Sequence, residues 1–277
     1  MSYIFNITKI QIMGILNVTP DSFYDGGAYG SPEAALARAM EMQAEGADIL
    51  DIGAQSTRPG STPLSAGEEL ERLLPALELI LRRVSIPVSV DTYHPETARQ
   101  ALAHGARIIN DVSGVVSEEM ARTVKDHGAG WILMHNAGGA DAVPEYQPDV
   151  VTVVEKALWD MTEQALAFGL QQTQLCVDPG IGFGKTREDD LALLAHTARL
   201  RISGVAYLVG ASRKRVTAMA GEGDRLSGTI AAHTAAQLGG ATILRAHDVK
   251  EARQAANIVN LISGKTSRSL DNSRKSM

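Results

Sequence analysis

Eight short apolar runs, each followed by a stretch with a helical pattern, constrain the fold more than any other feature of this sequence. Each run stops at a polar residue that is able to take part in chemistry. The runs are IQIMGIL (10–16), ADILDIG (47–53), IPVSV (86–90), ARII (106–109), GWILM (130–134), QLCV (174–177), VAYLVG (205–210) and ATIL (241–244). Eight β/α units in order predict an α/β fold, the (β/α)8 TIM barrel. In that fold, residues just past the carboxyl ends of the strands line one shared pocket.

Chain length and composition agree with one such barrel. The 277 residues accommodate a barrel of about 250 residues and a tail. Hydrophobic residues make up 44% and aromatic residues only 4%, which suits an aliphatic core of parallel strands buried on both faces. We expect a single domain over 1–262 and a flexible tail over 263–277, where few apolar residues are available for burial. Long polar stretches at 17–30 and 54–67 are expected to be working loops.

Charge and cysteine content disfavour several classes of protein. The net charge of −6 argues against generic nucleic-acid binding, which requires a basic surface. The single cysteine, Cys176, excludes an intramolecular disulfide and a cysteine-cluster metal site, and its apolar run predicts a packed thiol. Lys9 and Gln11 interrupt the N-terminal apolar stretch, so we expect no signal peptide, no membrane span and a cytoplasmic location.

Several helix boundaries can be predicted from local signals. Ser31 followed by Pro32 and Glu33 is typical of a helix start, and Ser117 followed by Glu118 and Glu119 resembles it. Four αβ junctions share a glycine directly before the next apolar run: AEGADIL, AHGARII, DHGAGWIL and LGGATIL. Glycine suits the left-handed position after a helix, so these junctions predict short αβ loops.

Three polar residues at the ends of apolar runs suggest recognition of a flat, nitrogen-rich ring. Asp91, Asn110 and Asp178 each follow such a run. A carboxylate accepts two parallel hydrogen bonds from an amidine-like pair of N–H groups, and asparagine both donates and accepts. The set therefore fits the edge of an aminopyrimidinone. For any single residue the alternative is a helix cap, since Asp and Asn are common caps.

A second, basic set suggests a site for a small anion. Arg58, Lys214, Arg245 and His247 follow apolar runs, and Asn17 ends the first one. Cationic groups at one barrel mouth repel one another, so we expect an anion between them, and the arginine fork suits phosphate oxygens. The loops after the last two strands of such barrels often bind phosphate, which would include Ser212. For Arg215 alone, a solvated helix start is the preferred interpretation.

Other motifs are weaker. GFGK at 182–185 is not a phosphate-binding P-loop, because the opening glycine of that pattern falls on Pro179. Its glycines would let the backbone pass close to a ligand, and Phe183 offers a ring for stacking. No cluster of His and Cys indicates a tight metal site, but Mg²⁺ carried on a diphosphate needs few protein ligands, of which Asn17 could be one.

Seven ordered motifs resemble dihydropteroate synthase of folate biosynthesis. They are MGILNVTPDSFYDGG (13–27), STRPG (56–60), SVDT (89–92), IND (109–111), DPGIGFGKT (178–186), SRK (212–214) and RAHDV (245–249). The resemblance covers residues from about 10 to 262. It implies a homodimeric (β/α)8 barrel that joins 4-aminobenzoate to (7,8-dihydropterin-6-yl)methyl diphosphate. The products would be 7,8-dihydropteroate and diphosphate, Mg²⁺ would be the cofactor, and sulfonamides would compete with aminobenzoate.

The resemblance also implies a role for each matching position. The pterin would be held by Asp91, Asn110, Asp178 and Lys214. The diphosphate would be held by Asn17, Arg58, Arg245 and His247, with Asn17 as the Mg²⁺ ligand. The 4-aminobenzoate pocket would consist of Phe23, Thr57, Pro59, Phe183, Ser212 and Lys214. Catalysis would be an SN1-like displacement that depends on Asp25, Arg58, Asp91, Asp178, Lys214, Arg245 and His247.

Three departures from the usual family pattern are visible. Ala54 and Gln55 replace the usual Gly and Glu before STRPG, so loop packing there is expected to differ. MHNAGG at 134–139 replaces the commoner MHMQG, and RAHDV replaces RVHDV. None of these changes removes a residue assigned to chemistry.

Two rival functions remain open at this point. A pterin-dependent methyltransferase on the same barrel would share Asp91, Asn110 and Asp178 but would not need Arg58, Arg245 and His247. A non-catalytic paralogue that binds a pterin without turnover has Gln55 as its only support in the sequence.

Overall fold

The eight apolar runs form the eight strands of one closed parallel barrel. The computed structural model describes residues 4–18, 31–55, 63–138, 143–218 and 225–264. Its strands are β1 (Gln11–Asn17), β2 (Ile49–Gly53), β3 (Val88–Asp91), β4 (Ile108–Asp111), β5 (Gly130–Met134), β6 (Leu175–Asp178), β7 (Ala206–Val209) and β8 (Ile243–Ala246). Each strand pairs with its sequence neighbour, and β8 closes the barrel on β1. The predicted TIM barrel is therefore confirmed.

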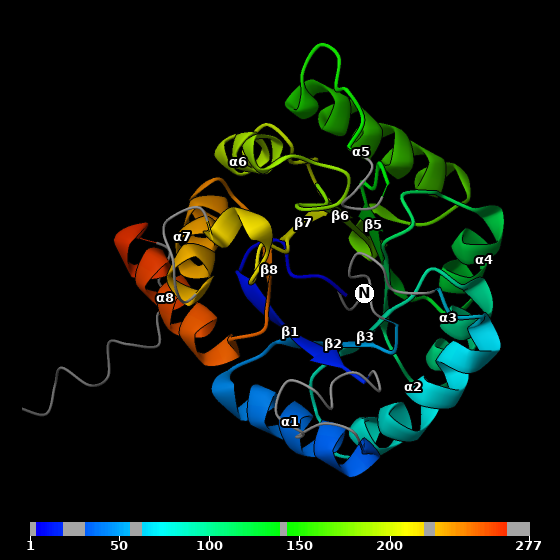
Figure 1. Ribbon diagram of the computed structural model, residues 1–277. Helices are drawn as coiled ribbons and strands as arrows, with labels where there is room; N and C mark the ends of the chain where they lie inside the picture. The colour runs from blue at the N-terminus through cyan, green and yellow to red at the C-terminus, as the bar shows by residue number, and fades with distance from the viewer. Residues whose placement is uncertain (1–3, 19–30, 56–62, 139–142, 219–224, 265–277) are drawn as a thin grey trace, which may run out of the picture.

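Eight α-helices surround the strands as an outer ring (Figure 1). They are α1 (Pro32–Glu45), α2 (Ala66–Leu81), α3 (Pro95–His104), α4 (Glu118–Asp126), α5 (Val150–Ala167), α6 (Arg187–Ala195), α7 (Arg225–Leu238) and α8 (Val249–Ile262). The described residues also contain two short 3-10 turns, η2 (Gln172–Gln174) and η3 (Arg215–Ala218). Among the described residues, none of these helices is both long and apolar enough to cross a bilayer.

The predicted helix boundaries are confirmed by their capping contacts. The side chain of Ser31 accepts a hydrogen bond from the Ala34 N–H, and Ser117 accepts one from Met120. Gly46 and Gly105 follow α1 and α3 in the left-handed conformation, with φ of 101° and 115°. Each glycine ends its helix so that the next strand starts within a few residues.

The strands are longer at their carboxyl ends than the apolar runs alone predict. Asn17, Asp91 and Asp178 are the last residues of β1, β3 and β6, and Arg245 is the third residue of β8. They are members of the ladder rather than residues beyond it. Their side chains are therefore aimed by the register of the barrel, which is stiffer than a loop.

Two apolar layers hold the barrel, one outside the sheet and one inside it. Alternate residues of a strand point to opposite faces, so Ile12 packs under the helices while its neighbour Met13 packs inside the barrel. The inner layer consists of Phe5, Met13, Ile49, Ile108, Ile132, Cys176, Ala206, Leu208 and Ile243. Cys176 is a buried free thiol, as predicted.

Phe5 packs against the amino-terminal end of the strands. Its side chain is 1% exposed, and a Cβ added to Gly130, the first residue of β5, would lie 2.9 Å from the Phe5 ring. The glycine thus leaves room for the ring to close this end of the barrel. The opposite, carboxyl end carries the polar residues.

We predict that Phe5→Ala lowers the free energy of unfolding by about 3–5 kcal/mol, because it opens a cavity at the closed end of the barrel. Urea unfolding followed by circular dichroism measures this. Ile7→Ala, at a side chain that is 40% exposed, is the matched control and should change stability by well under half as much. Equal small losses for both variants would contradict the role of Phe5.

Candidate active site at the carboxyl end of the barrel

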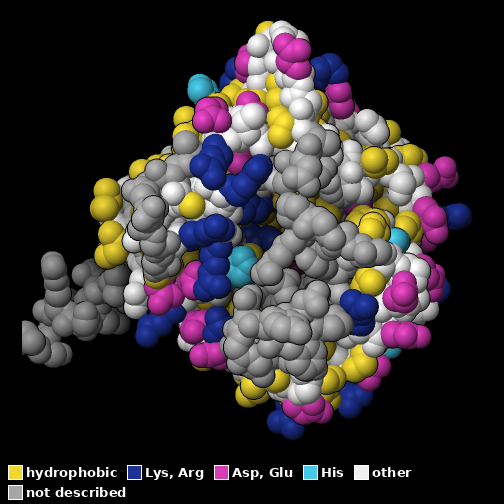
Figure 2. All heavy atoms as spheres, viewed as in Figure 1, with side chains coloured by type: hydrophobic (Ala, Val, Ile, Leu, Met, Phe, Trp, Pro, Cys, Tyr) yellow, Lys and Arg dark blue, Asp and Glu magenta, His cyan; other side chains and the backbone are white. Residues whose placement is uncertain are grey.

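The candidate residues that the structure describes come from six strands or from the turns after them. Asn17, Asp91, Asn110, Asp178, Phe183, Ser212, Lys214, Arg245 and His247 all lie at the carboxyl ends of strands or directly after them. Phe23, Asp25, Thr57, Arg58 and Pro59 lie outside the described residues. Figure 2 shows lysine and arginine side chains gathered on this face beside α6 and α7.

Arg245 forms the centre of the polar network. Its Nε donates to Asp51 Oδ2 at 2.6 Å and its Nη2 donates to Asp91 Oδ2 at 2.8 Å. Asn110 Nδ2 donates to the same Asp51 oxygen at 3.0 Å. Four strands, β2, β3, β4 and β8, are therefore connected through one guanidinium.

Asp51 is a functional candidate that the sequence interpretation missed. Its side chain is fully buried, and it neutralises Arg245 and anchors Asn110. The signal was available, because an acid in the middle of the apolar run ILDIG is unusual unless it has a partner. What the sequence did not contain was the identity of that partner on β8.

The carboxyl of Asp91 experiences opposing effects of burial and of its ion pair with Arg245. Burial raises its pKa to about 7; Arg245 opposes that shift, and the nearby charge of Asp51 adds to it. A Cβ added to Gly53 would lie 3.4 Å from Asp91 Cβ and 3.7 Å from Asn17 Oδ1. Asp91 and Asn17 thus stand on either side of a strand end that carries no side chain.

Asp178 and Lys214 form a second charged pair beside Arg245. Burial raises the pKa of Asp178 and lowers that of Lys214 to about 8, and each charge opposes the shift of the other. Lys214 Nζ also donates to the Ile181 carbonyl and lies 4.6 Å from the centroid of the Phe183 ring. The lysine is therefore held by a carbonyl and an aromatic face, and the charge of Asp178 favours its ammonium form.

The loop between β6 and α6 owes its shape to a buried lysine in the GFGK motif. Lys185 is fully buried, and its Nζ donates to the Phe183 carbonyl at 2.9 Å and to His135 Nδ1 at 3.0 Å. Burial lowers the pKa of His135 to about 4, so its ring is neutral and able to accept. Just before this motif, Gly180 passes close to the His135 backbone, because a Cβ there would lie 1.9 Å from the His135 carbonyl oxygen. The expectation that Gly182 and Gly184 let the backbone approach a ligand stays a prediction.

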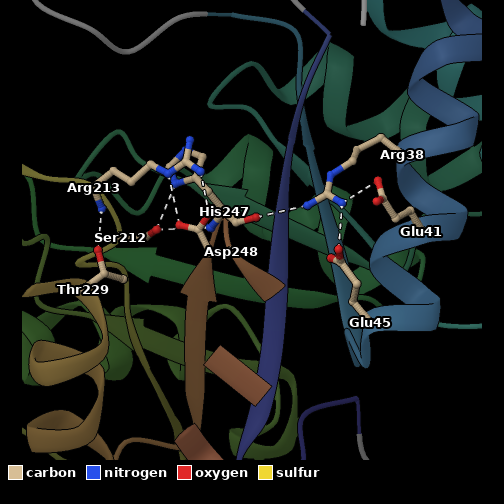
Figure 3. A network of polar contacts seen from close by, with 8 residues as sticks. All are labelled: Arg38, Glu41, Glu45, Ser212, Arg213, Thr229, His247 and Asp248. Atoms are coloured by element: carbon tan, nitrogen blue, oxygen red, sulfur yellow. Dashed lines mark hydrogen bonds and ion pairs between the residues drawn. The ribbon is translucent and has the colours of Figure 1, made fainter. Parts of the chain in front are cut away.

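His247 is held as a neutral ring at the end of β8. Its Nδ1 lies 2.9 Å from Ser212 Oγ, and its backbone N–H donates to the same oxygen at 3.1 Å (Figure 3). Burial lowers the pKa of His247 to about 3, with the charges of Arg245 and Arg213 adding to the effect. Ser212 is buried as well.

The sequence led us to expect that the residues of the basic set need an anion between them to offset their repulsion. For Arg245 and His247 this expectation is wrong. Arg245 is neutralised by Asp51 and Asp91, and His247 carries no charge at neutral pH. The acidic and basic residues, which the sequence analysis treats as two sets, form one network in the structure.

Gln55 has a defined role where the family usually has Glu. Its Nε2 donates to the Tyr93 hydroxyl at 2.9 Å, and its Oε1 accepts from the Leu64 N–H at 3.3 Å. The amide thus joins the ends of the stretch 56–62 to the turn after β3. The substitution keeps a polar contact here, because an amide both donates and accepts.

Asn17 is the one metal ligand that the sequence predicts, and its surroundings fit an ion that is bound mainly by the substrate and water rather than by the protein. Its side chain is exposed at the end of β1. Among the described residues, no group of three His, Cys, Asp or Glu side chains could hold a metal. A hard cation at this mouth would therefore take most of its oxygens from its ligand and from water.

Comparisons with known proteins agree on one family. The sequence model described as "Pterin binding enzyme" matches residues 13–247. Dihydropteroate synthase from Synechocystis sp. is 38% identical over 261 residues, which cover 92% of this chain and 90% of the relative.

Solved structures give the same result. The Xanthomonas albilineans dihydropteroate synthase with 4-aminobenzoic acid aligns with a TM-score of 0.86 at 41% identity and covers 93% of this chain and 94% of that one. The same enzyme in complex with 7,8-dihydropteroate gives 0.84 at 38%, with 95% and 97% coverage. A Yersinia pestis dihydropteroate synthase with a sulfonamide drug gives 0.87 at 35%, with 94% and 96% coverage.

His233 of α7 is a buried histidine behind this site. It is 1% exposed, and within the described part of the chain neither ring nitrogen has a hydrogen-bond partner. Burial lowers its pKa to about 4, and the charge of Lys214 adds to the shift. The unfolded chain binds a proton near pH 6.5, whereas the folded chain resists it until about pH 4. The stability contributed by the neutral ring is therefore present above pH 6.5 and lost as the pH falls.

We predict that His233→Leu makes the protein less sensitive to acid. Between about pH 6.5 and 4 the wild type should lose up to about 1.4 kcal/mol more per pH unit than the variant. Urea unfolding at several pH values measures both slopes. His196→Leu, at an exposed ring, is the control and should retain the wild-type slope. Parallel curves for wild type and His233→Leu would refute the prediction.

Proposed function

The chain belongs to the dihydropteroate synthase family of pterin-binding enzymes, and we infer that its barrel mouth performs that family's reaction. It is a transferase that joins 4-aminobenzoate to the methylene carbon of (7,8-dihydropterin-6-yl)methyl diphosphate. The products are 7,8-dihydropteroate and diphosphate. The observation that carries this conclusion most directly is the match to a synthase with bound 4-aminobenzoic acid over 93% of this chain.

The pterin is held by the acidic part of the network. Asp91, Asn110 and Asp178 offer acceptors and one amide to the aminopyrimidinone edge, and Lys214 adds a donor. Hydrogen bonds from ring N–H groups favour the ionised form of a carboxyl, so a bound pterin lowers the pKa of Asp91 from its raised value. Arg245 and Asp51 hold the Asp91 and Asn110 side chains in place before the pterin arrives.

The diphosphate leaves through the basic part of the network. Arg58, Arg245 and His247 donate hydrogen bonds to its oxygens and stabilise the negative charge that develops on them. The C–O bond then breaks with cationic character at the pterin methylene, and the fixed charges of Asp91 and Asp178 favour that cation. Asp25 contributes a further negative charge to this step.

The arylamine attacks the trapped methylene from its own pocket. Phe23, Thr57, Pro59, Phe183, Ser212 and Lys214 form the 4-aminobenzoate pocket. Lys214 lies against the Phe183 ring, so it connects the pterin and aminobenzoate sites. An arylamine is weakly basic, so orientation rather than a strong general base supplies much of the acceleration.

Mg²⁺ is the cofactor that we propose for the diphosphate. Asn17 would give it one side-chain oxygen, and the remaining ligands would be diphosphate oxygens and water. When bound, the ion neutralises charge on the leaving group. The exposed position of the Asn17 side chain at the mouth supports this assignment.

A homodimer formed through α7 and α8 is a further part of the proposal. Ile258, Leu261 and Ile262 of α8 are 56%, 48% and 77% exposed, and Leu238 at the end of α7 is 62% exposed. The two helices contact each other, and these four apolar side chains lie toward the carboxyl-terminal ends of both. We also propose a cytoplasmic location, which suits a free thiol and can be tested by cell fractionation.

The dimer proposal predicts that Ile258→Glu combined with Ile262→Glu yields monomers, because two carboxylates would be buried in the interface. Light scattering coupled to size exclusion measures the mass, and the wild type should have twice the chain mass. Trp159→Glu, at an exposed position on α5, is the control and should remain dimeric. A monomeric wild type would refute the dimer.

The proposed function predicts that the protein releases diphosphate and that this release depends on 4-aminobenzoate and Mg²⁺. A sulfonamide should inhibit the reaction in competition with aminobenzoate. Arg58→Ala should lower turnover by at least about 100-fold, the size expected for loss of a transition-state donor. Arg82→Ala, on the surface at the end of α2, is the control and should match the wild type. Tight pterin binding without turnover would support the non-catalytic alternative instead.

A further inference from the structure

Ser212 and His247 join the turns after β7 and β8. Ser212 Oγ lies 2.9 Å from His247 Nδ1 and 3.1 Å from the His247 backbone nitrogen. Figure 3 shows the two side chains facing each other between these turns. Ser212 is 4% exposed, so its hydroxyl has little access to water. Its hydrogen bonds are therefore set by His247.

One arrangement of the protons satisfies every donor in these two contacts. A backbone N–H can only donate, so the Ser212 oxygen accepts from His247 N. The hydroxyl has one hydrogen, and within the described residues the contact to Nδ1 is the one that gives this hydrogen an acceptor. Nδ1 then accepts, which leaves the ring proton on Nε2. The depressed pKa of His247, caused first by burial, agrees with this neutral tautomer.

The backbone of His247 is held from the other side by α1. Arg38 Nη2 donates to the His247 carbonyl at 3.3 Å. Arg38 itself is oriented by Glu41 at 2.7 Å and Glu45 at 3.2 Å on the same helix (Figure 3). The residue is thus fixed at its N–H, its carbonyl and its ring.

We propose that Ser212 is a positioning residue for His247, holding the ring in the tautomer that donates from Nε2 to the departing diphosphate, and that it is not a direct ligand of 4-aminobenzoate. A neutral ring gives a directed hydrogen bond without a positive charge that would repel Arg245. This inference rests on the proposed function, which places diphosphate at His247. It assigns to Ser212 a role other than the one that the family resemblance implies.

Ser212→Ala tests the proposal by separating the two substrates. Loss of the orienting hydroxyl should raise the KM for the dihydropterin diphosphate and lower kcat, with about a 10-fold fall in kcat/KM for that substrate. The KM for 4-aminobenzoate should not change. Ser212→Thr, which keeps a hydroxyl, should restore most of the loss. Ser89→Ala is the matched control, because that buried hydroxyl has no partner within the described residues and its loss should leave kinetics unchanged.

A double variant and a spectroscopic measurement complete the test. In a His247→Ala background, Ser212→Ala should have no further effect, since the group it orients is gone. Nitrogen chemical shifts of the His247 ring should show a proton on Nε2 in the wild type, a result that requires no variant to fold.

Three outcomes would overturn the proposal: a rise in the KM for aminobenzoate alone, additive losses in the double variant, or a wild-type ring protonated on Nδ1. Failure of the proposed function would be distinguishable, because the wild type would then release no diphosphate at all.

Discussion

The contact of Arg245 with Asp51 and Asp91 is the interaction on which the rest of the site depends. One guanidinium on the last strand pairs with two carboxylates on early strands, the fully buried Asp51 and the partly buried Asp91, and Asn110 is anchored through Asp51. Removing one partner from such a buried set leaves an uncompensated charge, which is strongly destabilising. The same contact holds in place the Asp91 and Asn110 side chains that we propose bind the pterin, and it keeps the arginine at the mouth. Stability and preorganisation therefore come from a single set of hydrogen bonds.

Around this centre the charged groups are arranged in pairs rather than in separate acidic and basic patches. Asp178 and Lys214 favour each other's charged forms, and the Lys185 ammonium is held by His135 and a backbone carbonyl. Burial alone would shift each of these groups toward its neutral form, and the partner charge opposes that shift. A substrate with N–H donors and phosphate oxygens can therefore replace some of these contacts, and the charged side chains that it binds are already oriented. This explains how a mouth with several buried charges can exist before any ligand binds.

The architecture could be predicted from the sequence because the pattern of apolar residues indicates which segments are buried. The residues at the strand ends could be predicted too, because a parallel barrel brings the carboxyl ends of its strands together. It was insufficient for the pairing of those residues. Asp51 and Arg245 are 194 positions apart, and nothing local indicates which acid meets which base. Lys185 was visible in GFGK, but its burial depends on His135, which comes from a different β/α unit. Ser212 was assigned by resemblance, and its contact with His247 becomes visible only when the turns after β7 and β8 are brought together.

The placement of the counter-ion on β8 has a consequence for the order in which the protein can mature. During synthesis Asp51 and Asp91 leave the ribosome 194 and 154 residues before Arg245. A nascent chain with seven β/α units therefore has the acids of its future site but not the cation that permits their burial as charged groups. Those acids must stay hydrated or protonated until the last strand inserts between β7 and β1. Closure of the barrel and the pairing of these acids with Arg245 therefore occur together, when the last strand is added.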